Sequence, residues 1–225
     1  MSGIALRLRE VRAQVAAALA RVGDPDREIV IVAVTKGHPA EVVLEVAQAG
    51  LLDVGENRVQ EAKAKIPVIE ETLRWHLVGH LQRNKATLAA QLFQTIHSVD
   101  SIRLVDALAA TGADLDVFLQ INVSGEDSKF GSRSEGAREL WQAALNAESL
   151  RVAGLMTMAP VEGAARPVFR TLRELRDDLS RTGDGPPLEC LSMGMSGDYG
   201  IAVEEGATHL RIGTALVGLR RGTLE

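Results

Sequence analysis

Hydrophobic residues occur along this chain in two alternating patterns. Short continuous runs rich in Val, Ile and Leu are typical of strands buried on both faces, as in parallel sheets. Apolar residues spaced three and four apart, with polar residues between them, are typical of amphipathic helices. The first pattern predicts strands at 29–36, 51–55, 73–79, 94–99, 115–123, 150–155, 188–192 and 208–212. The second predicts helices at 4–22, 40–49, 59–71, 85–91, 101–111, 134–147, 165–181 and 198–205.

This regular alternation predicts the fold class. Strands that alternate with helices form βαβ units and a parallel sheet, and eight such units favour a closed (β/α)8 TIM barrel. The helix at 4–22 precedes the first strand and is additional to the barrel. No linker or change in composition divides the chain, so we expect a single domain over residues 1–225. A doubly wound open sheet is the competing architecture, and the pattern alone does not exclude it.

Lys36 is the first candidate for chemistry. It ends the strand predicted at 29–36, and Gly37-His38-Pro39 then breaks the chain before the next helix. The carboxyl ends of parallel strands are where ligands bind in α/β folds. A partly desolvated lysine there loses its proton more readily and becomes a nucleophile towards carbonyl groups. The alternative interpretation is an ordinary solvated lysine at the end of a strand.

Other functional side chains also follow the predicted strands. If the barrel closes, these side chains lie with Lys36 at the carboxyl-end mouth of the barrel. The loops at the amino ends of the strands are predicted to be simple turns. The histidines lack the paired spacing of metal ligands, and His76 and His97 are expected to be satisfied core residues inside strands. We expect His80, which follows a strand, to line the pocket. The residues at the predicted mouth are Lys36, Glu56, Asn57, His80, Ser98, Asn122, Met156, Ser192, Gly194, Ser196, Arg211, Gly213 and Thr214.

Two of these loops are suited to phosphate. Ser192-Met193-Gly194-Met195-Ser196-Gly197-Asp198 combines glycines, hydroxyl groups and a following helix, so that backbone N–H groups can converge on an anion. Arg211-Ile212-Gly213-Thr214 offers similar chemistry after the last predicted strand. Each loop alone also reads as a tight turn. Together with a lysine nucleophile they indicate a phosphorylated carbonyl compound, either a sugar phosphate or pyridoxal phosphate.

Composition restricts the partners of the protein. The 225 residues include 25 basic and 30 acidic side chains, a net charge of −5, which argues against non-specific binding to nucleic acid. Cys190 is the only cysteine, so neither a disulfide framework nor a cysteine metal cluster is expected. The first residues lead into a charged amphipathic helix rather than a signal peptide, and no apolar run reaches transmembrane length. We therefore expect a cytoplasmic protein that binds neither nucleic acid nor membrane.

Six motifs together resemble the YggS/PROSC family of pyridoxal phosphate homeostasis proteins. The resemblance extends from about residue 6 to 218, and the joint set of motifs is highly specific. The motifs are Ala33-Val34-Thr35-Lys36, Gly55-Glu56-Asn57-Arg58-Val59-Gln60-Glu61, Trp75-His76-Leu77-Val78-Gly79-His80-Leu81-Gln82-Arg83-Asn84-Lys85, Gly154-Leu155-Met156-Thr157-Met158, Ser192-Met193-Gly194-Met195-Ser196 with Asp198, and Arg211-Ile212-Gly213-Thr214.

The resemblance implies a barrel like the N-terminal domain of alanine racemase, with pyridoxal phosphate in Schiff-base linkage to Lys36. It also implies phosphate contacts from both loops, with Arg211 beside the pyridine nitrogen. The chain departs from the family pattern at Val217, where Phe is usual, and at Arg58, where Tyr is frequent. The candidate cofactor-binding residues are therefore Lys36, Asn57, His80, Met156, Ser192, Met193, Gly194, Ser196, Arg211, Gly213 and Thr214.

The family implies a non-catalytic carrier that supplies the cofactor to apoenzymes, and we expect the protein to be a monomer. Two observations agree with this. An arginine at the ring nitrogen weakens the cofactor as an electron sink, and racemisation requires a second base opposite the lysine. Tyr199 is the only tyrosine in the chain and therefore the one candidate tyrosine for that base. An amino-acid racemase and a Schiff-base aldolase acting on a sugar phosphate are the alternatives. Lys129, in the polar loop at 125–133, is a candidate second anchoring point, or simply a solvated side chain.

Overall fold

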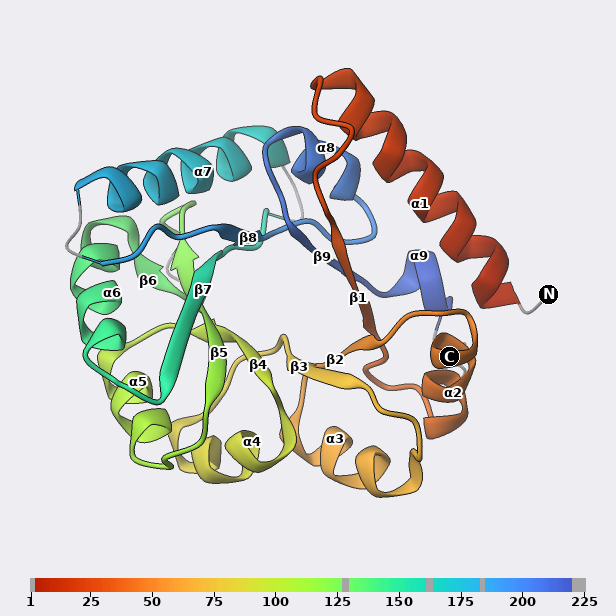
Figure 1. The fold of residues 1–225 in the computed structure, drawn as a ribbon, viewed down its shortest axis with the longest axis horizontal. Helices are drawn as coiled ribbons and strands as arrows, with labels where there is room; N and C mark the ends of the chain where they lie inside the picture. The colour runs from red at the N-terminus through yellow and green to blue at the C-terminus, as the bar shows by residue number, and fades with distance from the viewer. Residues whose placement is uncertain (1–2, 127–129, 161–163, 183–184, 220–225) are drawn as a thin grey trace.

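Eight parallel strands close into a barrel in the computed structural model, which describes residues 3–126, 130–160, 164–182 and 185–219 (Figure 1). Each strand pairs with the next, and the last pairs with the first, Ile31 lying opposite Leu210. This closing pair excludes the open sheet and confirms the predicted TIM barrel. The barrel strands are β1 (Val30–Val34), β2 (Asp53–Glu56), β3 (Arg74–Leu77), β4 (Thr95–Val99), β5 (Leu115–Asn122), β7 (Leu150–Met156), β8 (Cys190–Ser192) and β9 (His209–Ile212).

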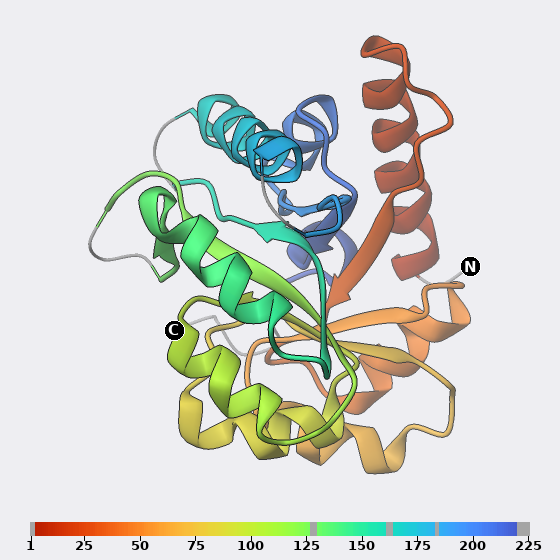
Figure 2. The same ribbon diagram turned by 60° about the vertical axis from the view of Figure 1, so that its left-hand side comes forward.

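Helices surround the barrel, and α1 extends along one side of it (Figures 1 and 2). That first helix packs against α8 and α9, which confirms that it is additional to the βα repeat. The helices are α1 (Gly3–Arg21), α2 (Ala40–Gln48), α3 (Val59–Lys65), α4 (Ala86–Leu92), α5 (Ile102–Ala109), α6 (Ala137–Leu145), α7 (Ala165–Thr182), α8 (Tyr199–Glu204) and α9 (Thr214–Val217), with 3-10 turns at Ile66–Val68, Arg83–Lys85 and Ser134–Gly136.

The apolar core lies mainly between the strands and the helices. Because side chains alternate along a strand, Ile31 and Ala33 of β1 enter this outer core, whereas Val32 and Val34 form a separate small cluster with Val78 inside the barrel. Gly55 faces the same interior, since a Cβ there would lie 2.9 Å from Val32 Cγ1. The interior of the barrel is thus distinct from the main core.

The structure differs from the predicted elements in several places. An additional two-residue strand, β6 (Ser132–Arg133), pairs with β5 beyond the barrel. The helix predicted at 59–71 ends at Lys65, because Pro67 follows within a 3-10 turn. Lys129 lies outside the described residues. Within the described parts of the chain, no helix is sufficiently long and apolar to cross a membrane.

Candidate functional site

A cavity of about 460 Å³ opens at the carboxyl ends of the barrel strands. This is the edge at which the sequence predicts a site, and the volume is in the range of small-molecule pockets. It is lined by Val34, Lys36, Asn57, Val78, Gly79, His80, Gln120, Phe130, Met158, Met195, Ser196, Gly197, Arg211, Gly213 and Thr214. Residues from most of the chain length therefore converge on one space.

Hydrogen bonds fix the backbone on both sides of Lys36. On one side the Thr35 hydroxyl donates to Glu56 Oε1 at 2.6 Å, and the Thr35 carbonyl accepts from Lys65 Nζ at 2.9 Å. On the other side Gly37, whose φ is +71°, donates its N–H to Glu61 Oε2 at 2.7 Å. Lys36 thus projects into the cavity from a backbone held at its two neighbours.

Glu56 was expected at the mouth, and this expectation is wrong. Its side chain is fully buried, and Oε1 forms an ion pair with Lys65 Nζ at 2.6 Å. Gly55 faces the barrel interior, so Glu56, as the next residue, faces the helix layer. Burial raises the pKa of Glu56, against the lowering effect of Lys65 and Thr35. Ser98 is likewise fully buried in β4 and does not line the cavity.

Arg211 brings a positive charge to the cavity wall, although only 4% of the residue is exposed. Its Nη1 donates to Ser192 Oγ at 2.6 Å, and its Nη2 donates to the Thr157 carbonyl at 2.8 Å. Burial lowers the pKa of Arg211 to about 10, partly offset by Asp198, so the guanidinium remains charged at neutral pH. The site therefore holds a fixed cationic donor.

The two predicted phosphate loops lie side by side. Ser196 Oγ accepts the N–H of Ala215 at 3.1 Å, which connects the loop after β8 to the start of α9. The backbone N–H groups of Ser196, Gly197, Gly213 and Thr214 have no acceptor among the described residues. All four residues line the cavity. Backbone N–H groups that lack an acceptor and converge on one place form an anion-binding site.

Gly194 is required for the shape of the first loop. Its φ is +95°, and a Cβ there would lie 2.5 Å from Cβ of Ala202 in α8. The same loop is closed by Asp198, whose Oδ1 accepts the Met195 N–H at 2.6 Å. Gly194 therefore shapes the loop from behind, and the loop presents Ser196 and Gly197 to the cavity.

Four of the predicted site residues lie behind the cavity wall. Met156, Ser192, Met193 and Gly194 are buried and do not line it. Met156 and Met193 are fully buried, whereas their neighbours Met158 and Met195 reach the cavity. The predicted residues that do line it are Lys36, Asn57, His80, Ser196, Arg211, Gly213 and Thr214.

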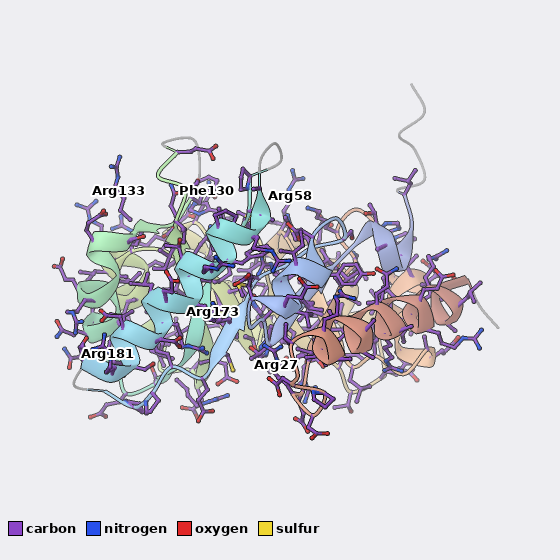
Figure 3. The ribbon with its side chains drawn as sticks, turned by 90° about the horizontal axis from the view of Figure 1, so that it is seen from above. Arg27, Arg58, Phe130, Arg133, Arg173 and Arg181 are labelled. Atoms are coloured by element: carbon purple, nitrogen blue, oxygen red, sulfur yellow. The ribbon has the colours of Figure 1, made fainter. Side chains whose placement is uncertain are left out.

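The sequence did not identify Gln120 or Phe130 as part of the site. Phe130 is 54% exposed, and its ring stacks on His80 with 3.9 Å between ring centroids. Gln120 holds it there by donating to the Phe130 carbonyl at 3.0 Å. Figure 3 shows Phe130 with Arg58 and Arg133 along the edge of the strand carboxyl ends, opposite Arg27. No sequence pattern in the polar loop around Phe130 predicted that its ring would form part of the cavity wall.

The residues in this cavity fit pyridoxal phosphate. They supply an amine that can react with the aldehyde of the cofactor, backbone N–H groups that can bind its phosphate, and a charged hydrogen-bond donor for its ring. Among the described residues no group of three or more His, Cys, Asp or Glu side chains is placed to hold a metal ion. The Tyr199 hydroxyl donates to Gln14 Oε1 of α1 at 2.5 Å, and Tyr199 does not line the cavity.

Comparisons with known proteins agree with this arrangement. Residues 6–221 match the family model of the alanine racemase N-terminal domain. A pyridoxal phosphate homeostasis protein of Aquifex aeolicus is 39% identical over 96% of this chain and 97% of its own length. The protein of that name in Pseudomonas aeruginosa is 40% identical over 98% of this chain and 97% of its own.

Solved structures show the same similarity. PipY of Synechococcus elongatus with pyridoxal phosphate bound is 34% identical and aligns with a TM-score of 0.83 over 96% of this chain and 100% of PipY. Alanine racemase of Oenococcus oeni, 16% identical, shares only the fold, with a TM-score of 0.66 over 94% of this chain and 63% of the racemase. The chain therefore belongs to the alanine racemase N-terminal domain family and, within it, to the pyridoxal phosphate homeostasis proteins.

Proposed function

We propose that this protein binds pyridoxal phosphate as a reversible Schiff base on Lys36 and supplies it to apoenzymes that require it. One observation carries the proposal: Lys36, the paired loops at Ser196 and Gly213, and the buried Arg211 line a single cavity. PipY, which binds this cofactor in its solved structure, supports it. The cofactor supplies an aldehyde that condenses with amines and a ring that withdraws electrons.

The lysine chemistry is reversible. With pyridoxal phosphate bound, the Lys36 amine would be the group that condenses with its aldehyde, with loss of one water molecule, and water or a second amine would reverse the linkage. The mouth of the cavity near His80 is open to solvent, since Phe130, which stacks on His80, is 54% exposed. An open site of this kind suits release better than protected catalysis.

Two features of the chain favour a carrier over a racemase. Arg211 remains a cation that can only donate hydrogen bonds, so protonation of a ring nitrogen beside it is disfavoured. Tyr199, the one tyrosine, donates its hydroxyl hydrogen to Gln14 and stands outside the cavity lining. The chain thus places no tyrosine base where racemisation requires one.

Transfer to an apoenzyme tests the proposal. The loaded protein is mixed with the apo form of a pyridoxal phosphate enzyme in the presence of a phosphatase that destroys free cofactor, and recovered activity is measured. We expect the loaded protein to restore activity under conditions where the same amount of free cofactor does not. Turnover of D- or L-alanine or serine by the loaded protein, or failure to restore activity, would contradict it.

A further inference from the structure

A chain of buried polar side chains extends through the barrel interior from its amino-terminal end to the cavity. Asp53 Oδ1 lies 2.9 Å from His76 Nε2, and His76 Nδ1 lies 3.0 Å from His97 Nε2. His97 Nδ1 is 2.7 Å from Ser192 Oγ, which accepts from Arg211 at 2.6 Å. These groups come from five strands: β2, β3, β4, β8 and β9.

The chain is almost entirely shielded from water. His97 and Ser192 are fully buried, and His76 is 3% exposed. Asp53, at the far end, is 8% exposed and receives two further hydrogen bonds from the exposed Arg74, at 2.7 and 2.6 Å. A polar chain in a barrel interior costs desolvation that an apolar filling would avoid. This cost suggests a role beyond packing.

The two ends of the chain set the directions of the hydrogen bonds at those ends. A guanidinium only donates and an ionised carboxylate only accepts, so Ser192 accepts from Arg211 and His76 donates from Nε2 to Asp53. A His76 ring with hydrogen on Nε2 alone accepts at Nδ1 from His97 Nε2, and a His97 ring with hydrogen on Nε2 alone accepts at Nδ1 from the Ser192 hydroxyl. With these two tautomers, every bond runs from the cavity towards Asp53.

The charges of the end groups are consistent with this direction. Burial raises the pKa of Asp53, but hydrogen bonds from His76 and Arg74 outweigh burial and lower it to about 2. Burial holds the pKa of His97 well below its usual range, with His76 and Arg211 acting in the same sense. Arg211 forms no ion pair with a carboxylate among the described residues. Asp198 acts on Arg211 only through space, whereas the hydrogen-bonded connection from Arg211 to a carboxylate runs through the chain.

We propose that Asp53, His76, His97 and Ser192 are positioning residues that hold the Arg211 guanidinium as a fixed donor towards the ring of bound pyridoxal phosphate. The inference rests on the proposed function of the cavity. Each bond polarises the next, so the carboxylate of Asp53 makes the Ser192 oxygen a better acceptor for Arg211. Arg211 itself touches the ligand, and the other four act through it.

The first arm of the test is nitrogen NMR of the cofactor-free protein with labelled histidines. The proposal predicts that His76 and His97 both carry hydrogen on Nε2 and have a bare Nδ1 at neutral pH. Hydrogen on Nδ1 of either ring would overturn the chain. This result does not depend on cofactor binding.

The second arm measures the affinity and the absorption band of added pyridoxal phosphate in Asp53→Asn and in Asp116→Asn. Asp116 is the control, because it also lies at the amino-terminal end of a barrel strand, as the second residue of β5, and forms an ion pair with Arg151, yet it is not part of the chain of polar side chains. We expect Asp53→Asn to weaken binding about fivefold and to move the band, and Asp116→Asn to change neither.

Equal behaviour of the two variants would overturn the inference while leaving the proposed function intact. Failure of the wild-type protein to bind would overturn the proposed function itself. If Asp53→Asn does not fold, His97→Phe replaces it, since a phenyl ring fills similar space but neither donates to His76 nor accepts from Ser192. An unchanged affinity and band in His97→Phe would equally overturn the inference.

Discussion

The guanidinium of Arg211 donates a hydrogen bond to the hydroxyl of Ser192, with 2.6 Å between Nη1 and Oγ. Ser192 does not line the cavity that Arg211 lines. A residue predicted as a phosphate ligand is instead the support of the cationic donor in the wall. The relationship connects the site to the barrel interior, and it leads to the first prediction.

Ser192→Ala is expected to lower both the stability of the protein and its affinity for pyridoxal phosphate. The change removes the Ser192 partner of both Arg211 Nη1 and His97 Nδ1 in a buried place, which costs about 1–3 kcal/mol of unfolding free energy. Ser98→Ala is the control, since the Ser98 hydroxyl is buried with no hydrogen-bond partner among the described residues. Denaturant unfolding and cofactor titration of both variants check this. Equal losses in the two would contradict the assigned role of Ser192.

Lys65→Met is expected to destabilise the protein by about 3–5 kcal/mol, because it leaves the carboxylate of Glu56 buried and unpaired. Arg151→Ala breaks an exposed ion pair with Asp116 and is expected to cost less than about 1 kcal/mol. Chemical denaturation of both variants at neutral pH measures the difference. A loss in Lys65→Met no larger than that in Arg151→Ala would show that the buried pair does not anchor the Lys36 segment.

Acid is expected to destabilise the protein through His209. Burial lowers the pKa of His209 to about 4 from 6.5, so between these values the unfolded chain binds a proton that the folded protein does not. The stabilising contribution is therefore complete above pH 6.5 and is lost as the pH falls towards about 4. In His209→Phe, the unfolding free energy should fall less steeply over this interval. An unchanged slope would contradict the assignment.

Gly194→Ala is expected to destabilise the loop after β8, because Gly194 has a φ of +95° and the new Cβ would lie 2.5 Å from Cβ of Ala202. The loss should be at least about 1 kcal/mol, and the affinity for pyridoxal phosphate should fall with it. Gly200→Ala is the control, since a Cβ at this helical position meets nothing within 4 Å. Thermal unfolding compares them, and equal melting temperatures would refute the steric argument.

Most of the fold could be predicted from the sequence because its signals are local. Runs such as Val30–Val34 identify a parallel strand without reference to the rest of the chain. Closure of the barrel depends on the pairing of β9 with β1, which no local pattern encodes, and it was inferred from the number of units. The strand β6 was missed because Ser132 and Arg133 have no apolar run and pair only because the loop folds back onto β5.

The site could be predicted only to the level of its loops. Chain order places Lys36 and Asn57 after their strands and Arg211 near the end of β9, and all three line the cavity. A shift of one residue along a strand turns a side chain to the opposite face of the sheet. For this reason Glu56 was wrongly expected at the mouth of the barrel. The contact between His76 and His97 could not be predicted, because it depends on the register of β3 and β4. This register pairs His76 with Thr95 and places His97, two residues further along β4, on the same interior face. The sequence showed both as core residues and could not show that they form a chain.

The absorption spectrum of the purified protein, titrated with pyridoxal phosphate, tests the central claim most directly. Wild type and Lys36→Ala are compared, and borohydride reduction is followed by identification of the labelled peptide. We predict a yellow band in the wild type alone, trapped by borohydride on the peptide that contains Lys36. The same band in both proteins, or in neither, would contradict the assignment of Lys36 as the residue that holds the cofactor.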